Sequence, residues 1–265
     1  MDFYLTALLQ GLCFSGLALG IYISMTIFNI PDITTDGSYT LGGVVTAVML
    51  GHQHSLPLVI LAVTAAGALA GALTGLIHTK LKINALLAGI LVMTGLYSIN
   101  LLIMGRSNVP LSNTASSLFS LVNISSNPNQ NMFWILLCFV IMITGLIGYL
   151  LKTDFGIAMR ATGNSESMIR ALGVNTDRMK ITGLALANAL TALSGFLITQ
   201  FQVFADISMG IGIVIVGLGS VMIAEAVINW LHITSIGLTL ILVLGGAIIF
   251  QLVLAFTLSI GIDAN

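Results

Sequence analysis

The segment KTDFGIAMRATGNSESMIRALGVNTDRMK, residues 152–180, decides how this chain is organised, because it is a polar segment inside a hydrophobic sequence. The chain has 8 Lys and Arg and 9 Asp and Glu residues, and this segment holds eight of these seventeen. They are Lys152, Asp154, Arg160, Glu166, Arg170, Asp177, Arg178 and Lys180. The sequence on either side is therefore expected to lie mostly in a membrane.

The composition agrees with this expectation. Hydrophobic residues make up 57% of the chain and charged residues only 6%, whereas soluble domains carry roughly 25% charged residues. The apolar runs repeatedly approach the ~20 residues that a helix needs to cross a bilayer. We therefore predict an all-α, polytopic membrane protein, a single transmembrane domain over residues 1–265 with about eight transmembrane or half-membrane segments. The segments are residues 3–29, 38–51, 56–78, 84–104, 132–151, 181–203, 209–228 and 234–257.

The second of these segments, residues 38–51, is too short to span comfortably and follows the polar run PDITTDGSYT. Two interpretations stay open. It is either a half-helix or a steeply broken helix, of the kind that lines a path or an interface within the membrane. Alternatively, it is an ordinary short helix capped at the membrane surface by Asp36 or Ser38.

The basic residues predict the orientation of the chain. Lys80 and Lys82 lie in one short loop, and residues 152–180 hold five of the eight basic residues. Positively charged loops tend to be cytoplasmic, so the 152–180 loop is predicted to be inside and the loop 105–131 to be extracytoplasmic. Both termini are then outside, provided that the second segment spans. The N-terminus has no basic residue before its apolar core, so we expect a retained first helix rather than a signal peptide.

A weak internal similarity suggests an inverted repeat. Pro31-Asp32-Ile33-Thr34 and Ala205-Asp206-Ile207-Ser208 each precede a Gly-rich apolar segment and follow a long helix. With one more segment after it, each forms a trio of segments, and in the predicted topology the first trio begins outside and the second inside, as in the inverted repeats of transporters. Gly-rich packing between membrane helices explains the similarity about as well.

Several kinds of chemistry have no motif in the sequence. Cys13 and Cys138 lie in apolar runs, and the histidines show no metal-ligand spacing, so we expect no metal site. The phosphate-binding pattern GxxxxGK[ST] is absent, as are HExxH and GxSxG. We therefore expect a chain that is not an enzyme and that binds no cofactor itself.

Within residues 152–180 the sequence predicts a helix of about two turns. The run Gly163-Asn164-Ser165 supplies a turn and the N-cap before this helix. Glu166 lies in its first turn, and Gly173 ends it. Such a helix is marginal alone, and Arg170 points away from its apolar side. That side either lies along lipid headgroups or inserts into a groove of a cytoplasmic partner. Three apolar residues form it: Met168, Ile169 and Leu172.

Polar residues in or near apolar segments are candidates for a solute pathway. Glu225 is the clearest, because a carboxylate deep in an apolar segment is costly unless it is paired, hydrated or protonated. The alternative is a neutral glutamic acid that forms a hydrogen bond across a helix interface, and helix-linking roles are equally open for the others, most of all for Asn188. The candidates are Asp36, Ser38, Tyr39, Thr40, Asn84, Asn188 and Glu225.

A resemblance selects among these interpretations. The run DFGIAMRATGNSESMIRALGVNTDRMKITG, residues 154–183, resembles the cytoplasmic loop of permease subunits of bacterial ABC importers, in the branch with branched-chain amino-acid and ribose-type permeases. Residues 32–43, 71–111 and 204–227 resemble the same family. The most similar sub-branch is often linked to aromatic amino acids, notably tryptophan.

The resemblance implies a permease subunit in the bacterial cell membrane, which works as a homodimer in membrane lipid. It also implies a cytoplasmic ATPase dimer, which binds ATP and Mg²⁺, and an extracytoplasmic binding protein that delivers an amino acid; no nucleic-acid partner is implied. The alternative class is a secondary transporter driven by an ion gradient. The ATPase-coupling residues implied are Gly163, Asn164, Ser165, Glu166, Ser167, Met168, Ile169, Arg170, Ala171, Leu172 and Gly173.

Overall fold

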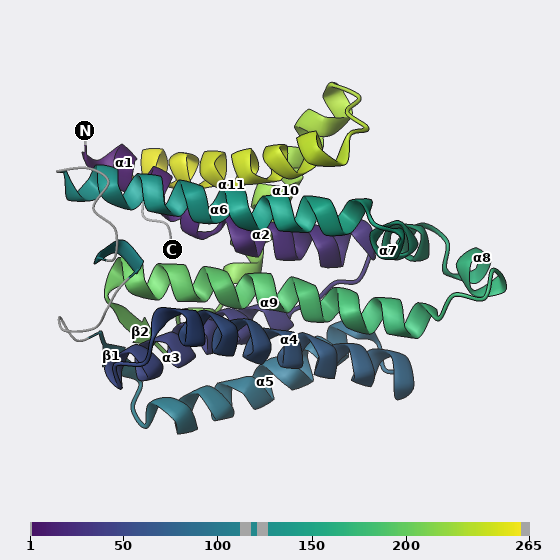
Figure 1. The fold of residues 1–265 in the computed structure, drawn as a ribbon, viewed down its shortest axis with the longest axis horizontal. Helices are drawn as coiled ribbons and strands as arrows, with labels where there is room; N and C mark the ends of the chain where they lie inside the picture. Colours follow the sequence, from purple (N-terminus) through teal and green to yellow (C-terminus); the bar gives the residue numbers. More distant parts are fainter. Residues whose placement is uncertain (1, 112–117, 121–126, 261–265) are drawn as a thin grey trace.

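The structure of the protein, a computed structural model, describes residues 2–111, 118–120 and 127–260. This part of the chain is a helical bundle with one two-stranded sheet (Figure 1). The elements are α1 (Asp2–Cys13), α2 (Ser15–Ile21), the π-helix η1 (Tyr22–Ile27), α3 (Thr34–Gly51), α4 (Leu56–Lys80), α5 (Ala85–Met104), β1 (Asn108–Pro110), the 3₁₀-helix η2 (Leu118–Ser120), α6 (Pro128–Lys152), α7 (Asp154–Asn164), α8 (Glu166–Ala171), α9 (Thr176–Gln202), β2 (Phe204–Asp206), α10 (Ile213–Trp230) and α11 (Ile236–Ser259).

Six described helices are long and apolar enough to cross a membrane: α4, α5, α6, α9, α10 and α11. The first predicted segment is a seventh if α1 is joined to α2 and η1, which follow it after a bend of 41°. The remaining predicted segment is α3, whose 18 residues are too polar to count as a span by composition. Each predicted segment is thus helical, and the all-α, polytopic fold is confirmed.

Helix α3 begins earlier than the sequence predicted. It starts at Thr34 rather than at residue 38, so the polar run before the apolar segment belongs to the helix. The polar side chains of this first turn are buried, and Thr34 forms a 2.7 Å hydrogen bond to Thr74 of α4. Polar groups of neighbouring helices inside the bundle therefore replace the water that would otherwise bond to the start of α3.

Helix α9 lies at the centre of the bundle and packs against α2, α3 and α4 (Figure 1). Two glycines allow close backbone approach. A Cβ on Gly71 of α4 would collide with the carbonyl oxygen of Leu184, and a Cβ on Gly195 would collide with that of Tyr39 in α3. Small residues at such crossings let membrane helices pack closely without a hydrophobic driving force.

Helices α3 and α10 both begin inside the bundle. Ser38, in the first turns of α3, bonds to Asn188 in the middle of α9, and Gly210 just before α10 lies against Asp36 of α3. Non-helical backbone at this depth is tolerated where other parts of the protein satisfy its polar groups. The prediction of an irregular second segment thus fits the structure better than a helix capped at the membrane surface by Asp36 or Ser38.

The two related sequence motifs have the same local geometry. Oδ1 of Asp32 accepts a 2.9 Å hydrogen bond from the backbone N–H of Thr34, and Oδ1 of Asp206 accepts a 2.8 Å bond from that of Ser208. The helices after the two motifs run in opposite directions. Helix α3 is parallel to α9, whereas α10 is parallel to α2 and η1, which are antiparallel to α9. Opposite directions after equivalent motifs are what an inverted repeat requires.

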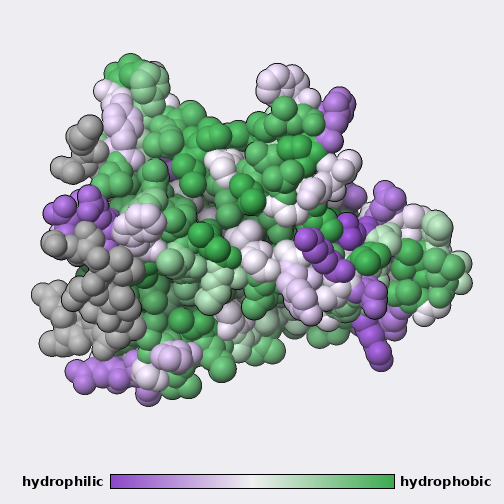
Figure 2. Space-filling view, turned by 45° about the horizontal axis from the view of Figure 1, so that its top comes forward, coloured by the Kyte–Doolittle hydropathy of each residue, from purple (hydrophilic) through white to green (hydrophobic). Residues whose placement is uncertain are grey.

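The outer surface of the bundle is apolar, as expected for contact with lipid. Figure 2 shows hydrophobic atoms over much of the visible face and hydrophilic atoms mainly towards its ends. Leu69 of α4, Leu102 of α5 and Ile215 of α10 are 71%, 83% and 69% exposed. A soluble protein would bury side chains of this kind in its core.

The short sheet lies at the end of the molecule opposite α8 (Figure 1). Strands β1 and β2 are antiparallel and pair Asn108 with Asp206. The predicted extracytoplasmic loop 105–131 contains β1 and η2, while its residues 112–117 and 121–126 lie outside the described part. The sheet therefore joins this loop to the segment between α9 and α10.

Candidate coupling site and membrane pathway

Helices α7 and α8 project from one end of the bundle, between α6 and α9 (Figure 1). Thr153 caps α7, because its hydroxyl accepts a hydrogen bond from the N–H of Gly156. Helix α7 was not among the predicted segments, and only Thr153 followed by Asp154 in the first turn indicated its start. A rigid helix therefore leads from α6 to α8.

Helix α8 matches the short helix that the sequence predicted. It spans Glu166–Ala171, follows the extended residue Ser165, and is followed by Leu172 and by Gly173, which has a φ of 86°. Ser165 occupies the N-cap position without a side-chain capping bond. No residue within α8 is buried, so this chain alone does not cover the helix.

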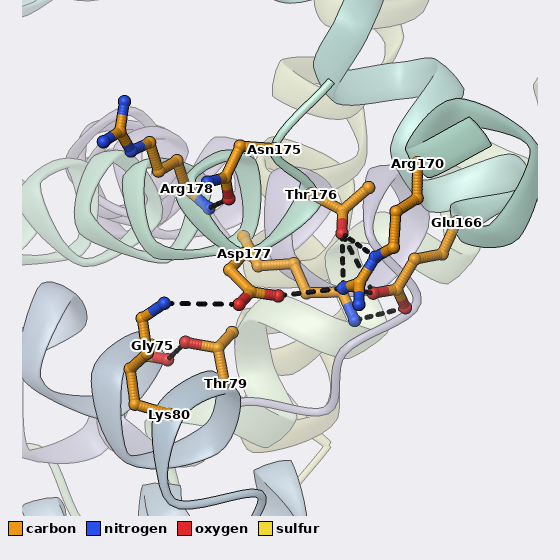
Figure 3. Close-up of polar contacts among 10 residues, drawn as sticks. Gly75, Thr79, Lys80, Glu166, Arg170, Asn175, Thr176, Asp177 and Arg178 are labelled. Carbon is orange, nitrogen blue, oxygen red and sulfur yellow. Dashed lines mark hydrogen bonds and ion pairs between the residues drawn. The ribbon is translucent and has the colours of Figure 1, made fainter. Parts of the chain in front are cut away.

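The predicted apolar side of α8 is open. Met168 is 63% and Leu172 is 70% exposed, while Ile169 is half-buried. Arg170 points instead towards the start of α9 (Figure 3). The structure thus separates an exposed apolar pair from a polar side that faces the bundle, whereas Ile169, predicted on the same side as the pair, is not fully exposed.

The polar side of α8 belongs to a network that we call the polar clamp, made of Lys80, Glu166, Arg170, Thr176, Asp177 and Lys180 (Figure 3). Arg170 donates from Nη2 to Glu166 at 3.0 Å, to Thr176 at 2.7 Å and to Asp177 at 2.9 Å. Thr176, which is 1% exposed, is the buried centre of the clamp.

Two lysines connect the clamp to the membrane helices. Lys180 of α9 donates to Glu166 Oε2 at 2.6 Å, and Lys80, the last residue of α4, pairs with Asp177 at 3.4 Å. The clamp therefore joins α8 to the ends of α4 and α9. Because α4 and α9 pack along their length, a displacement of α8 would act directly on the centre of the bundle.

The hydrogen bond from Lys180, followed by the other contacts of the clamp, lowers the pKa of the Glu166 carboxyl, and partial burial opposes this effect. A lowered pKa in the folded state stabilises the fold above the unfolded value, which is about 4.3 for Glu. This stabilisation falls as the pH drops below that value and is lost below the lowered pKa. At neutral pH the Glu166 carboxyl is therefore ionised and keeps these contacts.

Arg170→Met should loosen α8 without unfolding the protein. The substitution removes the donor that joins Glu166, Thr176 and Asp177, yet exposed ion pairs contribute only about 0–1 kcal/mol each. We expect amide hydrogen exchange across α8 to accelerate at least about fivefold, with an unchanged melting temperature. Arg178→Met is the matched control, since the side chain of Arg178 is exposed and has no ion pair among the described residues. Equal exchange in both variants would contradict a role for the clamp.

Several pathway candidates meet in the interior. The Ser38 hydroxyl donates to Asn188 Oδ1 at 2.6 Å, and Asn188 Nδ2 donates to Asp32 Oδ2 at 2.7 Å. All three residues are fully buried. These bonds link α3 to α9, which is the helix-linking role that the sequence analysis favoured for Asn188. Asp32 was not among the candidates, although its PDIT motif had already marked the position.

Asp36 holds the start of α10. Its carboxylate oxygens accept hydrogen bonds from the backbone N–H groups of Gly212 and Val214, each at 2.9 Å. A carboxylate is well suited to this position, because the N-terminus of a helix carries free N–H donors and partial positive charge. Asp36 therefore connects α3 to α10 at the depth where both begin.

The other candidates occupy separate positions. Tyr39 is 2% exposed and stacks on Phe14, and Thr40 donates to the carbonyl oxygen of Asp36. Asn84 lies at the start of α5, where its side chain accepts from the N–H of Leu86. It is a helix cap, as its place directly before an apolar run could have indicated.

Glu225 forms a hydrogen bond across a helix interface. The hydroxyl of Thr26 in η1 donates to Glu225 Oε1 at 2.7 Å, and the carboxyl is half-buried. This geometry fits the interpretation of Glu225 as a link between helices. The described residues include no group of three or more His, Cys, Asp and Glu side chains that could hold a metal ion.

The fold and this site define a class of protein: a multi-pass membrane protein with an exposed helical segment at one end of the bundle. The family model described as the branched-chain amino acid transport system permease component matches residues 3–263. The chain belongs to this family. It is accordingly a non-catalytic membrane subunit of an ABC importer in the inner membrane. Membership of this family rules out the alternative of a secondary transporter driven by an ion gradient.

Relatives of known sequence agree with the family. A tyrosine transport system permease protein of Clostridioides difficile is 38% identical over 261 residues, which cover 98% of this chain and 85% of the relative. Uncharacterized protein RP368 of Rickettsia prowazekii is 36% identical, covering 86% of this chain and 78% of that protein. An autoinducer 2 import system permease protein of Salmonella choleraesuis is 30% identical, covering 74% and 55%. No solved structure matches the chain.

Proposed function

We propose that the chain forms the translocation pathway of an ATP-driven importer for an amino acid, with an aromatic amino acid as the favoured solute. Two copies form the pathway, a separate ATPase dimer supplies the energy, and an extracytoplasmic binding protein delivers the solute. The similarity to a tyrosine transport system permease supports this class of solute. The family, which transports branched-chain amino acids by its description, supports an amino acid more generally.

One observation carries the assignment of the coupling site: α8 presents an exposed apolar pair while its polar side is held by the clamp. Met168 and Leu172 are too exposed to stabilise this chain itself. Apolar residues exposed together commonly mark a surface that binds a partner. An amphipathic helix that enters a hydrophobic groove uses residues at this spacing, and α8 is therefore the helix that binds the ATPase.

Met168→Asp and Leu172→Asp should abolish association with the ATPase. Each places a charge where an apolar side chain would enter the partner, and an unpaired buried charge is costly. The complex is purified from native membranes through a tagged wild-type permease, and its ABC ATPase is identified by mass spectrometry. We expect each variant to retain less than about a tenth of the wild-type ATPase while it inserts normally.

Leu231→Asp is the matched control for this experiment. Leu231 is a 52% exposed leucine in the turn between α10 and α11, away from α8 (Figure 1). It should retain the ATPase at the wild-type level. If the Met168 and Leu172 variants copurify with the ATPase as well as this control does, α8 is not the coupling helix.

A further inference from the structure

A small hollow opens on the surface where α3, α5 and the segment before α10 meet. Its volume is about 20 Å³, and Asp36, Tyr97, Asn100 and Ile211 contribute to its wall. A space of this size holds about one water-sized group. It lies at the depth where Asp36 caps α10, and thus within the membrane part of the bundle.

Asn100 is the unusual residue in this hollow. It is 1% exposed, and its Nδ2 donates a weak 3.4 Å hydrogen bond to the carbonyl oxygen of Gly37. Its Oδ1 is buried and accepts no hydrogen bond from any residue that the structure describes. A buried acceptor without a donor is costly. Asn100 Oδ1 therefore needs a hydrogen-bond donor, which another molecule would supply.

The Asp36 carboxylate adds further acceptor positions to the hollow, while the Thr40 hydroxyl, which also lines it, donates to the Asp36 carbonyl oxygen and the Tyr97 hydroxyl can donate or accept. Each oxygen of the Asp36 carboxylate accepts one backbone N–H bond, and a carboxylate oxygen can accept two. The described residues that line the hollow include no lysine or arginine. The free acceptors of Asn100 and Asp36 favour a small group with several N–H donors.

We infer that this hollow is a subsite for the ammonium group of the transported solute, with Asn100 Oδ1 and the Asp36 carboxylate as acceptors. The inference rests on the proposed function, because it assigns a residue-level contact to the solute of that importer. An ammonium group has three donors and fits the available space. The remainder of the solute lies outside the hollow, against the exposed side chains of Tyr97 and Ile211.

The surface around the hollow agrees with contact to a solute. Tyr97 is 48% and Ile211 is 67% exposed, and together they offer an aromatic ring and an aliphatic surface. Thr94 and Ser98, on the same helix as Tyr97, are also exposed. A helix face that combines these polar side chains with an aromatic ring is less suited to lipid than the leucine-rich surface of α4.

The first test replaces Asn100 by leucine, which has a similar size and no acceptor. The wild-type complex of permease, ATPase and binding protein is reconstituted in vesicles, and the radiolabelled L-amino acid that it imports fastest is the probe. Asn100→Leu should lower the maximal uptake rate at least about tenfold with an unchanged KM and unchanged ATPase copurification. Asn229→Leu, an exposed asparagine near the end of α10, is the matched control and should import normally. Wild-type uptake by Asn100→Leu would overturn the inference.

The second test keeps Asn100 and measures the access of water to the hollow. The native cysteines Cys13 and Cys138 are replaced by serine, and Tyr97→Cys is treated with a charged, membrane-impermeant thiol reagent. We expect labelling of Tyr97→Cys, which excess solute slows. Leu69→Cys, at a similar depth on a lipid-facing surface, should stay unlabelled. If Tyr97→Cys is as inert as Leu69→Cys, the surface faces lipid and the inference fails.

The importer function and the ammonium subsite can be contradicted separately. A wild-type complex that imports no solute with ATP would count against the proposed function. A wild-type complex that imports only solutes without an ammonium group would overturn the subsite and leave the importer. ATP-driven amino acid uptake that Asn100→Leu does not change would also overturn only the subsite.

Discussion

Asp36→Leu should prevent the protein from folding stably in the membrane. Asp36 is 6% exposed, and its two oxygens accept the N–H groups of Gly212 and Val214 at the start of α10. Hydrogen bonds to a charged group contribute about 1.5–3 kcal/mol each, and the leucine would also leave both donors unpaired inside the bundle. We expect a loss of about 3–6 kcal/mol, which is a large part of the ~5–15 kcal/mol by which folded proteins are stable. Size-exclusion chromatography after detergent extraction, with the melting temperature of any soluble fraction, measures it.

Two further variants separate this structural role from a role in transport. Asp36→Asn keeps one acceptor oxygen and the shape of the side chain, so it should fold with an intermediate melting temperature. Asp154→Leu removes an exposed carboxylate from the first turn of α7, where a helix-end charge contributes about 0.3–1 kcal/mol. A melting temperature of Asp36→Leu equal to that of Asp154→Leu would show that α10 does not depend on this cap.

The sequence predicted the membrane helices well because the relevant signal is local. Each segment is a continuous apolar run, and the length that a bilayer demands leaves little choice of structure. Helix α8 was predicted for a similar reason, since Ser165 before it and Gly173 after it are short-range signals. The predicted turn was wrong at Gly163 and Asn164, which form the end of α7. That Met168 and Leu172 share one side of the helix followed from spacing alone, but which molecule covers them did not.

The interior contacts were harder to predict, because they join residues far apart in the chain. Asp32 reaches Asn188, and Asp36 reaches Gly212. No local pattern contains such pairs. The polar candidates were therefore recognised as a set without their partners, and Asp32, the carboxylate that binds Asn188, was not among the candidates. The first turn of α3 was also missed for this reason, since its polar residues resemble a loop until their buried partners are known.

The polar clamp depends both on local sequence signals and on contacts between residues far apart in the chain. Its residues belong to the charged segment that the sequence marked at once, apart from Lys80 at the end of α4. Their arrangement depends on the packing of α4 against α9, which brings Lys80 to Asp177. Thr176 carried no signal, because a threonine at the start of a helix is common. Its burial beneath Arg170 becomes visible only in three dimensions.

Gly71→Leu should disrupt the centre of the bundle. A side chain at this position of α4 would collide with the carbonyl group of Leu184 and with the side chain of Asn188. Backbone atoms of a packed helix cannot move aside without displacing α9, on which α2 and α3 also pack. Overpacking usually costs about 1–3 kcal/mol, and a collision with backbone belongs at or above the upper end. We expect little monodisperse protein after extraction and no ATP-driven uptake.

Gly145→Leu is the matched control, because it makes the same change in another membrane helix, α6, at a position where an added Cβ meets no described atom within 4 Å. Leucine also favours a helix more than glycine does, so this variant should match or exceed the wild-type melting temperature. Gly71→Ala should lie between the two, since a single methyl group already meets the Leu184 carbonyl. If Gly71→Leu and Gly145→Leu are equally stable, α4 and α9 do not pack as closely as the structure places them. The polar clamp would then not be connected through α4 and α9 to the buried Asp32–Asn188 pair.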